Sequence, residues 1–303
     1  MIEIAVVGGG PAGLTAALYA ARAGRSVTVF EGNSFGGQIT QSPLVENYPG
    51  LANVSGMELG DRMYVQAEQA GATLSFSGVE AIQKSATGTF LLTTEDGIVE
   101  ALSVIYAAGA APRHLELPGE EALVGRGISY CALCDGAFFA NQDVAVAGGG
   151  NTALEDALYL SERCRSVTLI HRRNTFRAES ALVERAKATG NLTIVTQVQI
   201  TALLAQDGNL TGLLLQKQDG TAKTLAVSGL FVAFGRVPDT APLSGLAARD
   251  EQGYVLTDGQ MQTPTPGLFA AGDCRHKQIR QLTTAVSDGT VAAISACRYL
   301  RNR

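Results

Sequence analysis

Two cysteines separated by two residues, Cys131 and Cys134, are the side chains with the clearest capacity for chemistry in this sequence. Such a pair can be half of a zinc site, a redox-active disulfide or a coincidence. A structural zinc site needs four ligands, whereas the other cysteines and the histidines are scattered singly along the chain. A disulfide that closes so small a loop adds little stability, and cytosolic disulfides tend to be catalytic. The pair therefore favours dithiol–disulfide redox chemistry, and we expect no metal site.

An acidic residue, Asp135, directly follows the second cysteine. Disulfide exchange proceeds through a thiolate, and the departing sulfur leaves more easily when it is protonated. Asp135 can supply that proton if burial raises its pKa. The alternative is that Asp135 only forms a turn or cap before Gly136, which is a common place for aspartate.

A glycine-rich turn near the N-terminus has the pattern of a nucleotide-binding site. It follows an apolar run, residues 4–7, that is typical of a buried parallel strand, and it precedes an alanine-rich helical stretch. Gly8 would allow a tight turn, Gly10 would let the backbone approach a pyrophosphate, and Gly13 would permit close helix–strand packing. Free N–H groups at the helix start would bind the phosphates, and Glu31 would accept hydrogen bonds from a ribose. An ordinary glycine-rich turn is the alternative reading.

The same unit recurs in the middle of the chain. The apolar run 143–147 precedes Gly148, Gly150 and Ala153, and a helical stretch and a second strand follow. That second strand ends at His171, which is 23 positions after Gly148, and Glu31 is also 23 positions after Gly8. Two units with the same internal offset predict two related nucleotide-binding domains.

The two cradles differ in charge at the end of the second strand. The first has Glu31, whereas the second has His171 followed by Arg172, Arg173 and Arg177. A carboxylate would repel a ribose 2′-phosphate, and arginines would bind it through charge-assisted hydrogen bonds. The first cradle therefore suits FAD or NAD and the second suits NADPH, unless these arginines are only a solvated surface cluster.

Two proline-containing segments, 111–119 and 236–242, flank the second unit. Proline fixes its own φ and restricts the preceding residue, so both segments are predicted to be stiff linkers. We therefore predict an α/β protein with two Rossmann-like, three-layer nucleotide-binding domains, the second inserted into the first. The first domain would comprise residues 1–114 and 243–303, and the second, residues 115–242, would carry the cysteine pair.

Composition excludes several other classes of protein. The 303 residues are 46% hydrophobic, enough for full cores, and the net charge of −5 is unlike the basic surface of a nucleic-acid binder. We find no apolar run of about 18 residues that would span a membrane, and no basic-then-apolar leader at the start. Five cysteines are too few and too unevenly spaced for a disulfide scaffold. We expect a cytoplasmic protein that binds neither nucleic acid nor membrane.

Redox potentials restrict which molecules can donate electrons to such a disulfide. A thioredoxin disulfide lies near about −270 mV, and the glutathione pool, at about −220 to −260 mV by extraction, cannot drive its reduction. A nicotinamide donor with a flavin relay can drive it, and this combination matches the two predicted cradles.

These motifs, in this order, resemble those of the bacterial low-molecular-weight thioredoxin reductases over essentially the whole chain. Any one motif could mislead, but the full ordered set is highly specific. The matching segments are residues 8–13, 36–38, 46–50, 107–110, 131–136, 148–153, 171–173, 176–178, 272–273 and 280–281.

The resemblance implies that FAD is held by the first and last segments of the chain and NADPH by the middle. Asp273 would bind the ribitol chain, as the Gly-Asp motif does in such flavoproteins. The residues implied for FAD are Gly8, Gly10, Pro11, Ala12, Gly13, Glu31, Gly36, Gly37, Gln38, Asn47, Ala108, Gly109, Asp273, Arg280, Gln281 and Leu282. Those implied for NADPH are Gly148, Gly150, Asn151, Thr152, Ala153, His171, Arg172, Arg173 and Arg177.

The resemblance also implies roles at the redox pair. Cys134 would be the sulfur next to the flavin, Cys131 would attack the disulfide of thioredoxin, and Asp135 maps onto the acid of the family. Family members are homodimers, and they rotate the inserted domain to bring either the cysteines or the nicotinamide to the flavin. We therefore expect a homodimer that moves electrons from NADPH through FAD and the cysteine pair to thioredoxin.

Three features depart from the family pattern. Asn151-Thr152 replaces a frequent Asp-Ser, and both pairs can cap a helix. Leu133 is larger than the residue often found between the two cysteines, which could tune their reactivity. Cys274 directly follows Asp273, and we expect it to be a small buried residue rather than a reactive thiol.

Three alternative functions remain open. A reductase of the same fold can take electrons from another donor such as reduced ferredoxin, but a degenerate second cradle would then be typical. A ferredoxin/flavodoxin–NADP oxidoreductase would lack the cysteine pair, and a non-catalytic redox sensor would need neither Arg177 nor the linkers. The sequence shows no thioredoxin-like extension at its start, which argues against a hydroperoxide-reductase flavoprotein subunit.

Overall fold

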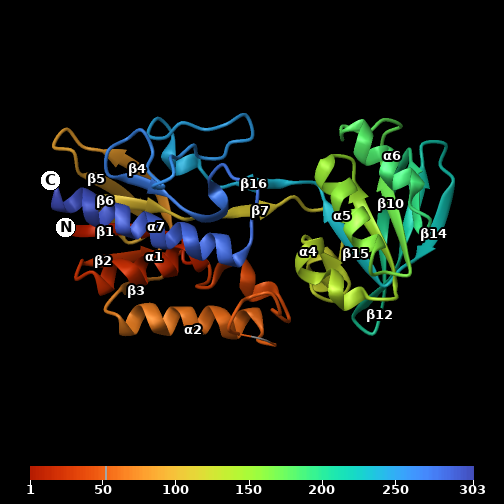
Figure 1. Cartoon of the computed structure of the whole chain (residues 1–303), viewed down its shortest axis with the longest axis horizontal. Helices are drawn as coiled ribbons and strands as arrows, with labels where there is room; N and C mark the ends of the chain where they lie inside the picture. Colours follow the sequence, from red (N-terminus) through yellow and green to blue (C-terminus); the bar gives the residue numbers. More distant parts are fainter. Residues whose placement is uncertain (52) are drawn as a thin grey trace. The chain divides into compact units, whose positions relative to one another are not determined.

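The computed structural model describes residues 1–51 and 53–303, and the chain divides into two compact units (Figure 1). The first unit consists of Met1–Ala111 and Val237–Arg303, and the second is Pro112–Arg236. Each unit has a largely or wholly parallel sheet with helices. The predicted fold class, two Rossmann-like units with one inserted into the other, is confirmed.

The second unit ends at Arg236, six residues before position 242, where the sequence predicted the end of the inserted domain. Thr240 is buried and its Oγ1 donates a hydrogen bond to the Gly253 carbonyl at 2.9 Å. Leu243 is fully buried in a core cluster of the first unit. The segment after β16 (Arg236–Pro238) therefore packs with the first unit and is not a free linker.

The sheet of the first unit is built around the apolar run that precedes the first glycine turn. Its strands are β1 (Ile2–Val7), β2 (Val27–Phe30), β3 (Thr73–Ser75), β4 (Val79–Lys84), β5 (Phe90–Thr94), β6 (Gly97–Tyr106) and β17 (Leu268–Ala270). The order is β3-β2-β1-β6-β5-β4, with β17 beside β6, and only the β4–β5 and β5–β6 pairs are antiparallel. Ile4 and Val6 face one core cluster and Ala5 and Val7 face another. Both faces of β1 are covered, which explains its unbroken apolar run.

Two helices pack closely against each other in the first unit. The helical elements there are α1 (Pro11–Arg22), α2 (Gly56–Gln69), α7 (Leu282–Arg301) and the 3₁₀ turns η1 (Gly37–Gln41), η3 (Ala241–Leu243) and η4 (Gly272–Cys274). A Cβ at Gly289 would lie 2.2 Å from the Ala12 carbonyl oxygen. α7 can therefore approach the first turn of α1 only because residue 289 is glycine.

The second unit repeats the arrangement with an entirely parallel central sheet in the order β11-β10-β9-β15-β8. Its strands are β8 (Ile128–Ser129), β9 (Asp143–Gly148), β10 (Ser166–His171), β11 (Leu192–Thr196) and β15 (Gly229–Ala233), with an antiparallel sheet of β12 (Val198–Gln206), β13 (Asn209–Lys217) and β14 (Ala222–Ala226). Its helical elements are α3 (Glu120–Leu123), α4 (Ala132–Asp135), η2 (Gly136–Phe139), α5 (Asn151–Ser161) and α6 (Ser180–Ala188). Val144 and Val146 face one core cluster, and Ala145 and Ala147 face the other, as on β1.

The chain passes between the units twice, at neighbouring positions. β7 (Ala110–Pro112) and β16 pair as a two-stranded ribbon. The Arg113 amide extends this pairing by donating to the Gly235 carbonyl at 3.0 Å. Both crossings contain a proline, as the sequence predicts for the linkers.

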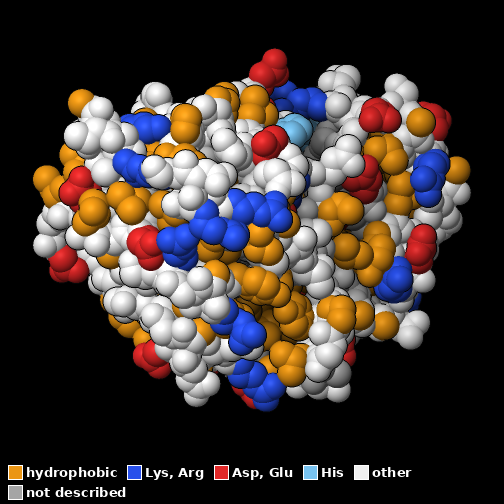
Figure 2. Space-filling view, turned by 60° about the vertical axis from the view of Figure 1, so that its left-hand side comes forward, with side chains coloured by type: hydrophobic (Ala, Val, Ile, Leu, Met, Phe, Trp, Pro, Cys, Tyr) orange, Lys and Arg blue, Asp and Glu red, His pale blue; other side chains and the backbone are white. Residues whose placement is uncertain are grey.

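Charged side chains of both signs are spread over the surface. On the face shown in Figure 2, lysine and arginine side chains form short clusters among acidic and hydrophobic ones. Within residues 1–51 and 53–303, no helix is both long enough and apolar enough to cross a membrane.

Candidate redox centre and nucleotide-binding cradles

The cysteine pair forms a disulfide in the second unit, with the Cα atoms of Cys131 and Cys134 5.3 Å apart. Cys131 is the N-cap of α4, and its sulfur accepts a hydrogen bond from the Cys134 amide at 3.2 Å. Both cysteines are partly exposed, and Leu133 between them is exposed. Among the residues that the structure describes, no three His, Cys, Asp or Glu side chains are grouped so as to hold a metal ion.

Asp135 lies beside the disulfide with its carboxyl turned into the protein. Burial raises the pKa of Asp135 above its usual range, and a hydrogen bond from Ser129 opposes that rise. Asp135 Oδ1 is buried and finds no hydrogen-bond partner among the described residues. The side chain makes no capping bond to η2, so the carboxyl does not act as a helix cap there. Burial favours the protonated form of a carboxyl, which is the form that a general acid needs.

Ser129 is a residue at this centre that sequence reasoning missed. It is buried at the end of β8, and its Oγ lies 2.6 Å from Asp135 Oδ2. The Cys131 amide donates to the same Oγ at 3.1 Å. The signal in the sequence was weak, because a single serine two residues before a cysteine has no motif that marks it.

The first cradle is formed by the turn between β1 and α1. Gly8 has φ +105°, and a Cβ there would lie 2.4 Å from the Ala107 carbonyl oxygen. A Cβ at Gly13 would lie 1.9 Å from the Gly8 carbonyl oxygen, whereas one at Gly10 would meet no atom within 4 Å. The helix begins with Pro11 and has no side-chain cap and no acid in its first turn. Its first N–H groups and the open space at Gly10 therefore suit a bound anion.

Glu31 lies directly after β2 and faces this turn. Its Oε2 accepts a hydrogen bond from the Gly9 amide at 2.6 Å, and its Oε1 accepts one from the Asn33 amide at 2.9 Å. These bonds fix the carboxylate, and each oxygen retains a lone pair that can accept a bond from a ribose hydroxyl.

The remaining residues implied for FAD lie in loops of the same unit, and two contacts join them across the sequence. Gln38 Nε2 donates to the Ala110 carbonyl at 2.7 Å, and Asn47 Nδ2 donates to Gln281 Oε1 at 3.3 Å. The Arg280 guanidinium lies 4.0 Å from the centre of the Tyr254 ring. Among the others, Gly36, Gly37 and Gly109 have left-handed backbone, and Pro11, Ala12 and Leu282 lie in the first turns of α1 and α7. Ala108 is partly buried in the loop between β6 and β7.

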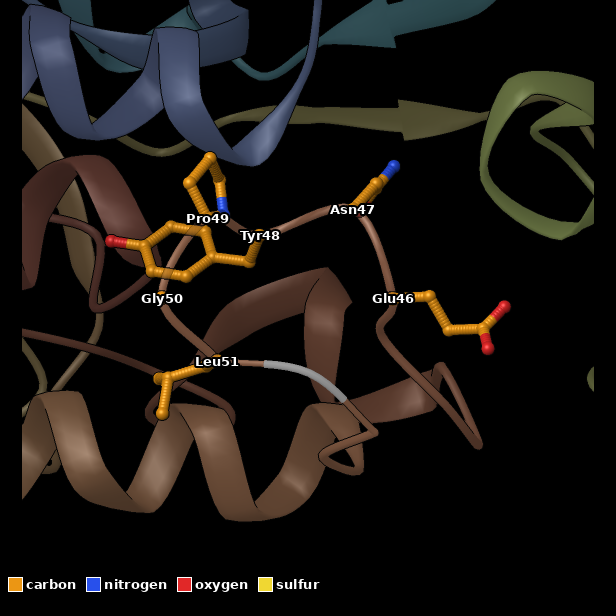
Figure 3. Close-up of a pocket in the computed structure, with 6 residues that line it drawn as sticks. All are labelled: Glu46, Asn47, Tyr48, Pro49, Gly50 and Leu51. Atoms are coloured by element: carbon orange, nitrogen blue, oxygen red, sulfur yellow. The ribbon is translucent and has the colours of Figure 1, made fainter.

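Asn47 also lines an open pocket of about 490 Å³ formed by Glu46, Asn47, Tyr48, Pro49, Gly50 and Leu51. Figure 3 shows Glu46 and Asn47 pointing away from the side chains of Tyr48 and Leu51. Tyr48 and Leu51 pack on a small core cluster that includes Leu59 of α2 and Leu282 at the start of α7. This packing anchors the loop and leaves the Asn47 amide next to Gln281.

The second cradle, between β9 and α5, repeats the packing of the first. A Cβ at Gly148 would lie 2.6 Å from Ala153 Cβ and 2.7 Å from the Ala233 carbonyl oxygen, and one at Gly150 would meet nothing within 4 Å. Gly150 is the N-cap of α5, and no side chain caps the helix. Asn151 and Thr152, which are residue types that can cap a helix, therefore do not cap α5 here.

Asn151 is the first residue inside α5, and its amide is held by another segment. Asn151 Nδ2 donates to Glu179 Oε1 at 2.9 Å, and its Oδ1 accepts from the Glu179 amide at 2.9 Å. Thr152 is exposed in the first turn of the helix. The start of α5 is thus open, and Asn151 ties it to the residue that precedes α6.

The segment after β10 carries the basic residues to this cradle. His171 is buried, its ring stacks on Phe176, and a Cβ at Gly149 would collide with it at 2.1 Å. The Arg177 amide donates to the Gly149 carbonyl at 2.9 Å. The His171 ring packs against Gly149 and leaves no room for a side chain there. The bond from the Arg177 amide holds the basic segment next to the glycine turn.

Arg172, Arg173 and Arg177 are exposed. None of the three forms an ion pair with any residue in 1–51 or 53–303. Three unneutralised guanidinium groups beside an open helix start are suited to bind a phosphate.

A buried cluster of charges holds Asp273 in the first unit. Asp288 of α7 accepts hydrogen bonds from the Gly272 amide at 3.1 Å, Arg275 Nε at 2.9 Å and Lys277 Nζ at 3.0 Å. Burial raises the pKa of Asp288, but the bonds from Arg275 and Lys277 outweigh it and hold that pKa below its usual range. Lys277 Nζ also lies 3.5 Å from Asp273 Oδ1, a buried oxygen that accepts no hydrogen bond among the described residues. Asp273 is thus oriented so that its Oδ1 can still accept a hydrogen bond.

Cys274, next to Asp273, is fully buried and donates to the Ala271 carbonyl at 3.2 Å. Burial raises the pKa of Cys274 to about 12. The group is therefore a thiol at neutral pH and has little nucleophilic thiolate, in line with the packing role expected of it.

We expect Asp288→Asn to lower the free energy of unfolding by about 3–5 kcal/mol near neutral pH, because buried Lys277 and Arg275 lose their counter-charge. The pKa of Asp288 is depressed in the folded state, so its stabilisation is complete above the unfolded-state pKa, about 3.9, and is lost as pH falls below it. Urea unfolding at several pH values measures both effects. Asp143→Asn, which breaks an exposed pair with Arg165, is the control and should cost less; equal losses would contradict this account.

Comparison with known proteins agrees with this geometry. The chain matches the model of the pyridine nucleotide-disulphide oxidoreductase family over residues 2–289. It is 44% identical to the thioredoxin reductase of Mycolicibacterium smegmatis, over 98% of this chain and 96% of that protein. It is also 44% identical, over 98% of its length, to a bifunctional thioredoxin reductase/thioredoxin of Mycobacterium leprae, of which it spans 66%.

A solved structure extends the agreement to three dimensions. The crystal structure of thioredoxin reductase from Streptococcus pyogenes matches with a TM-score of 0.96 at 39% identity, covering 100% of this chain and 99% of the other. The chain therefore belongs to the pyridine nucleotide-disulphide oxidoreductase family, among its thioredoxin reductases.

Proposed function

We propose that this protein is an NADPH-dependent, FAD-containing thioredoxin-disulfide reductase. The observation that carries the proposal is the partly exposed Cys131–Cys134 disulfide with Asp135, a buried carboxyl of raised pKa, beside it. The relatives named above support the reaction, and the name of the Mycobacterium leprae relative, which joins a reductase to a thioredoxin, supports the acceptor.

The first unit fits FAD. The open space at Gly10, the uncapped start of α1 and the fixed carboxylate of Glu31 suit an adenosine diphosphate with a free ribose hydroxyl. Asp273 Oδ1, which is buried and accepts no hydrogen bond from the part of the chain that the structure describes, suits a hydroxyl of the ribitol chain. Bound there, FAD would supply two-electron transfer between a nicotinamide and a disulfide.

The second unit fits NADPH as the electron-donating substrate. Gly150 and the uncapped start of α5 would receive the pyrophosphate, and Arg172, Arg173 and Arg177 would bind the 2′-phosphate. Reduced ferredoxin, the alternative donor, would need neither an open cradle nor three exposed arginines that no described residue neutralises. This difference favours NADPH.

The cysteines would carry the exchange with thioredoxin. Two electrons and two protons convert the disulfide to a dithiol. The Cys131 thiolate attacks one sulfur of the thioredoxin disulfide, and the other thioredoxin sulfur leaves with a proton. The Cys134 sulfur, having lost its proton, then attacks Cys131 Sγ. The bond between Cys131 and thioredoxin breaks, the second thioredoxin sulfur leaves and takes up the second proton, and the Cys131–Cys134 disulfide is restored. The bond from the Cys134 amide to Cys131 Sγ stabilises negative charge on Cys131, which favours it as the attacking sulfur.

Asp135 would be the proton donor in this exchange. Its carboxyl O–H bond breaks as an S–H bond forms on a departing sulfur, and burial, which raises the pKa of Asp135, favours the protonated form that donates. A homodimeric assembly and a rotation of one unit about the β7–β16 ribbon stay predictions from the resemblance, and a cytoplasmic location stays a prediction from the sequence.

Replacing Cys131 or Cys134 with serine should abolish thioredoxin turnover while NADPH still bleaches the flavin absorbance, because either change removes the disulfide and leaves both cradles intact. Stopped-flow absorbance and a thioredoxin-coupled assay measure the two steps separately. Cys164→Ala, at a buried free cysteine of the same unit, is the control and should keep turnover. Normal thioredoxin turnover in either serine variant would show the cysteine mechanism to be wrong.

The double change Arg172→Ala with Arg173→Ala should raise the KM for NADPH by about 10- to 100-fold, since charge-assisted hydrogen bonds to the 2′-phosphate are lost. The KM for NADH, which lacks that phosphate, should change little. Steady-state kinetics with both nucleotides measure the ratio. The matched control is Arg163→Ala with Arg165→Ala, two arginines that lie just before the first residue of β10. An equal loss for both nucleotides would refute the 2′-phosphate assignment.

A further inference from the structure

We propose that Ser129 is a positioning residue whose hydroxyl satisfies the Asp135 carboxyl in both of its protonation states, so that Asp135 can give up a proton without rearrangement of the surrounding backbone. This inference rests on the proposed function, in which Asp135 is the proton donor. Ser129 belongs neither to the cysteine motif nor to a cradle; it lies at the end of β8, two residues before Cys131, and its hydroxyl reaches Asp135.

The contacts of Ser129 tie together both ends of the redox segment. Ser129 is 4% exposed at the end of β8, where it pairs with Phe231 of β15. Its Oγ lies 2.6 Å from Asp135 Oδ2, 3.1 Å from the Cys131 amide nitrogen and 3.3 Å from the Cys131 carbonyl oxygen. One buried hydroxyl thus reaches the acid and the backbone on either side of the Cys131 side chain.

A hydroxyl has one hydrogen to donate and two lone pairs that accept. When Asp135 is ionised, Ser129 donates to Asp135 Oδ2 and accepts from the Cys131 amide. When Asp135 is protonated, its own hydroxyl donates to Ser129 Oγ, and the Ser129 hydrogen turns to the Cys131 carbonyl. In neither state is a buried donor left without an acceptor, which would be costly.

The consequence concerns the proton that the exchange consumes. As a sulfur departs, the Asp135 O–H bond breaks and an S–H bond forms, and the electron pair of the broken O–H bond stays on the carboxylate. The Ser129 hydroxyl then rotates about its Cβ–Oγ bond and donates a hydrogen bond to the newly formed carboxylate. Burial works against that charge and the Ser129 hydrogen bond works for it, so Ser129 keeps the carboxyl from holding its proton too tightly.

Other titratable groups lie on the elements around Asp135. α5, which packs against α4, carries Glu155, Asp156 and Tyr159, and burial followed by the charge of Glu155 raises the pKa of Asp156 to about 7. Tyr130, next to Ser129, donates to Glu120. The influences on the pKa of Asp135 are burial first and the Ser129 bond second. Cys131 and Cys134 do not titrate while they are joined, so the test uses the oxidised protein.

The test is an NMR titration of the oxidised holoprotein labelled with ¹³C at the aspartate carboxyl groups, with Asp135 assigned through Asp135→Asn. Removing a donor to the carboxylate in Ser129→Ala should raise the Asp135 midpoint by about one pH unit. Ser129→Thr, which keeps the hydroxyl, should restore it. Ser129→Cys, a near-isosteric variant with a weaker donor, should shift the midpoint in the same direction as alanine. Ser103→Ala, which removes another buried serine hydroxyl in the other unit, should leave it in place.

Turnover supplies the second readout. The limb of the kcat profile that depends on Asp135 should move to higher pH in Ser129→Ala, and the same change in an Asp135→Asn background should have no further effect on kcat. An unshifted Asp135 midpoint in Ser129→Ala and Ser129→Cys, or an additive loss in the double variant, would overturn the proposal. The NMR titration needs neither NADPH nor thioredoxin, so failure of the wild type to reduce thioredoxin would refute the proposed function separately.

Discussion

Two segments of backbone can touch only where no Cβ stands between them, and both nucleotide cradles depend on this constraint. A side-chain carbon would lie 1.9 Å from the Gly8 carbonyl at Gly13 and 2.7 Å from the Ala233 carbonyl at Gly148. The same holds where α7 meets α1 at Gly289. Because these contacts are made by glycine, each helix starts directly at the end of a buried strand. Its first N–H groups then face open space at Gly10 or Gly150, where an anion can bind.

The charged side chains near the two candidate sites differ in burial and in pairing. In the first unit, Asp288, Arg275 and Lys277 neutralise one another in the interior, and their role is to fix the segment that carries Asp273. In the second unit, Arg172 and Arg173 stay exposed beside the cradle and form no ion pair with any residue that the structure describes. A buried charge needs a partner within the protein, whereas an exposed charge can be kept for a ligand. The first arrangement suits a permanently held group and the second a substrate that is exchanged.

Local patterns predicted the elements more reliably than the contacts between them. The glycine spacing and the apolar runs placed β1, α1, β9 and α5 correctly, because both depend on nearest neighbours in sequence. The bond from Ser129 to Asp135 joins residues only six positions apart, but a serine before a cysteine pair belongs to no motif that marks it, so the sequence did not single it out. Asn151 is a residue type that can cap a helix, but it binds Glu179, 28 positions away, which a local rule cannot foresee. Thr240 was placed in a linker but packs in the first unit through Gly253.

The central claim is that electrons pass from NADPH to thioredoxin through a flavin and the Cys131–Cys134 pair. The most direct test follows the flavin absorbance of the purified wild-type protein without oxygen, on adding NADPH, NADH and then oxidised thioredoxin. The account predicts bleaching by NADPH at a lower concentration than by NADH, and recovery of the absorbance when thioredoxin is added. A flavin that stays oxidised with both nucleotides would contradict it and would make a ferredoxin-type donor the leading hypothesis.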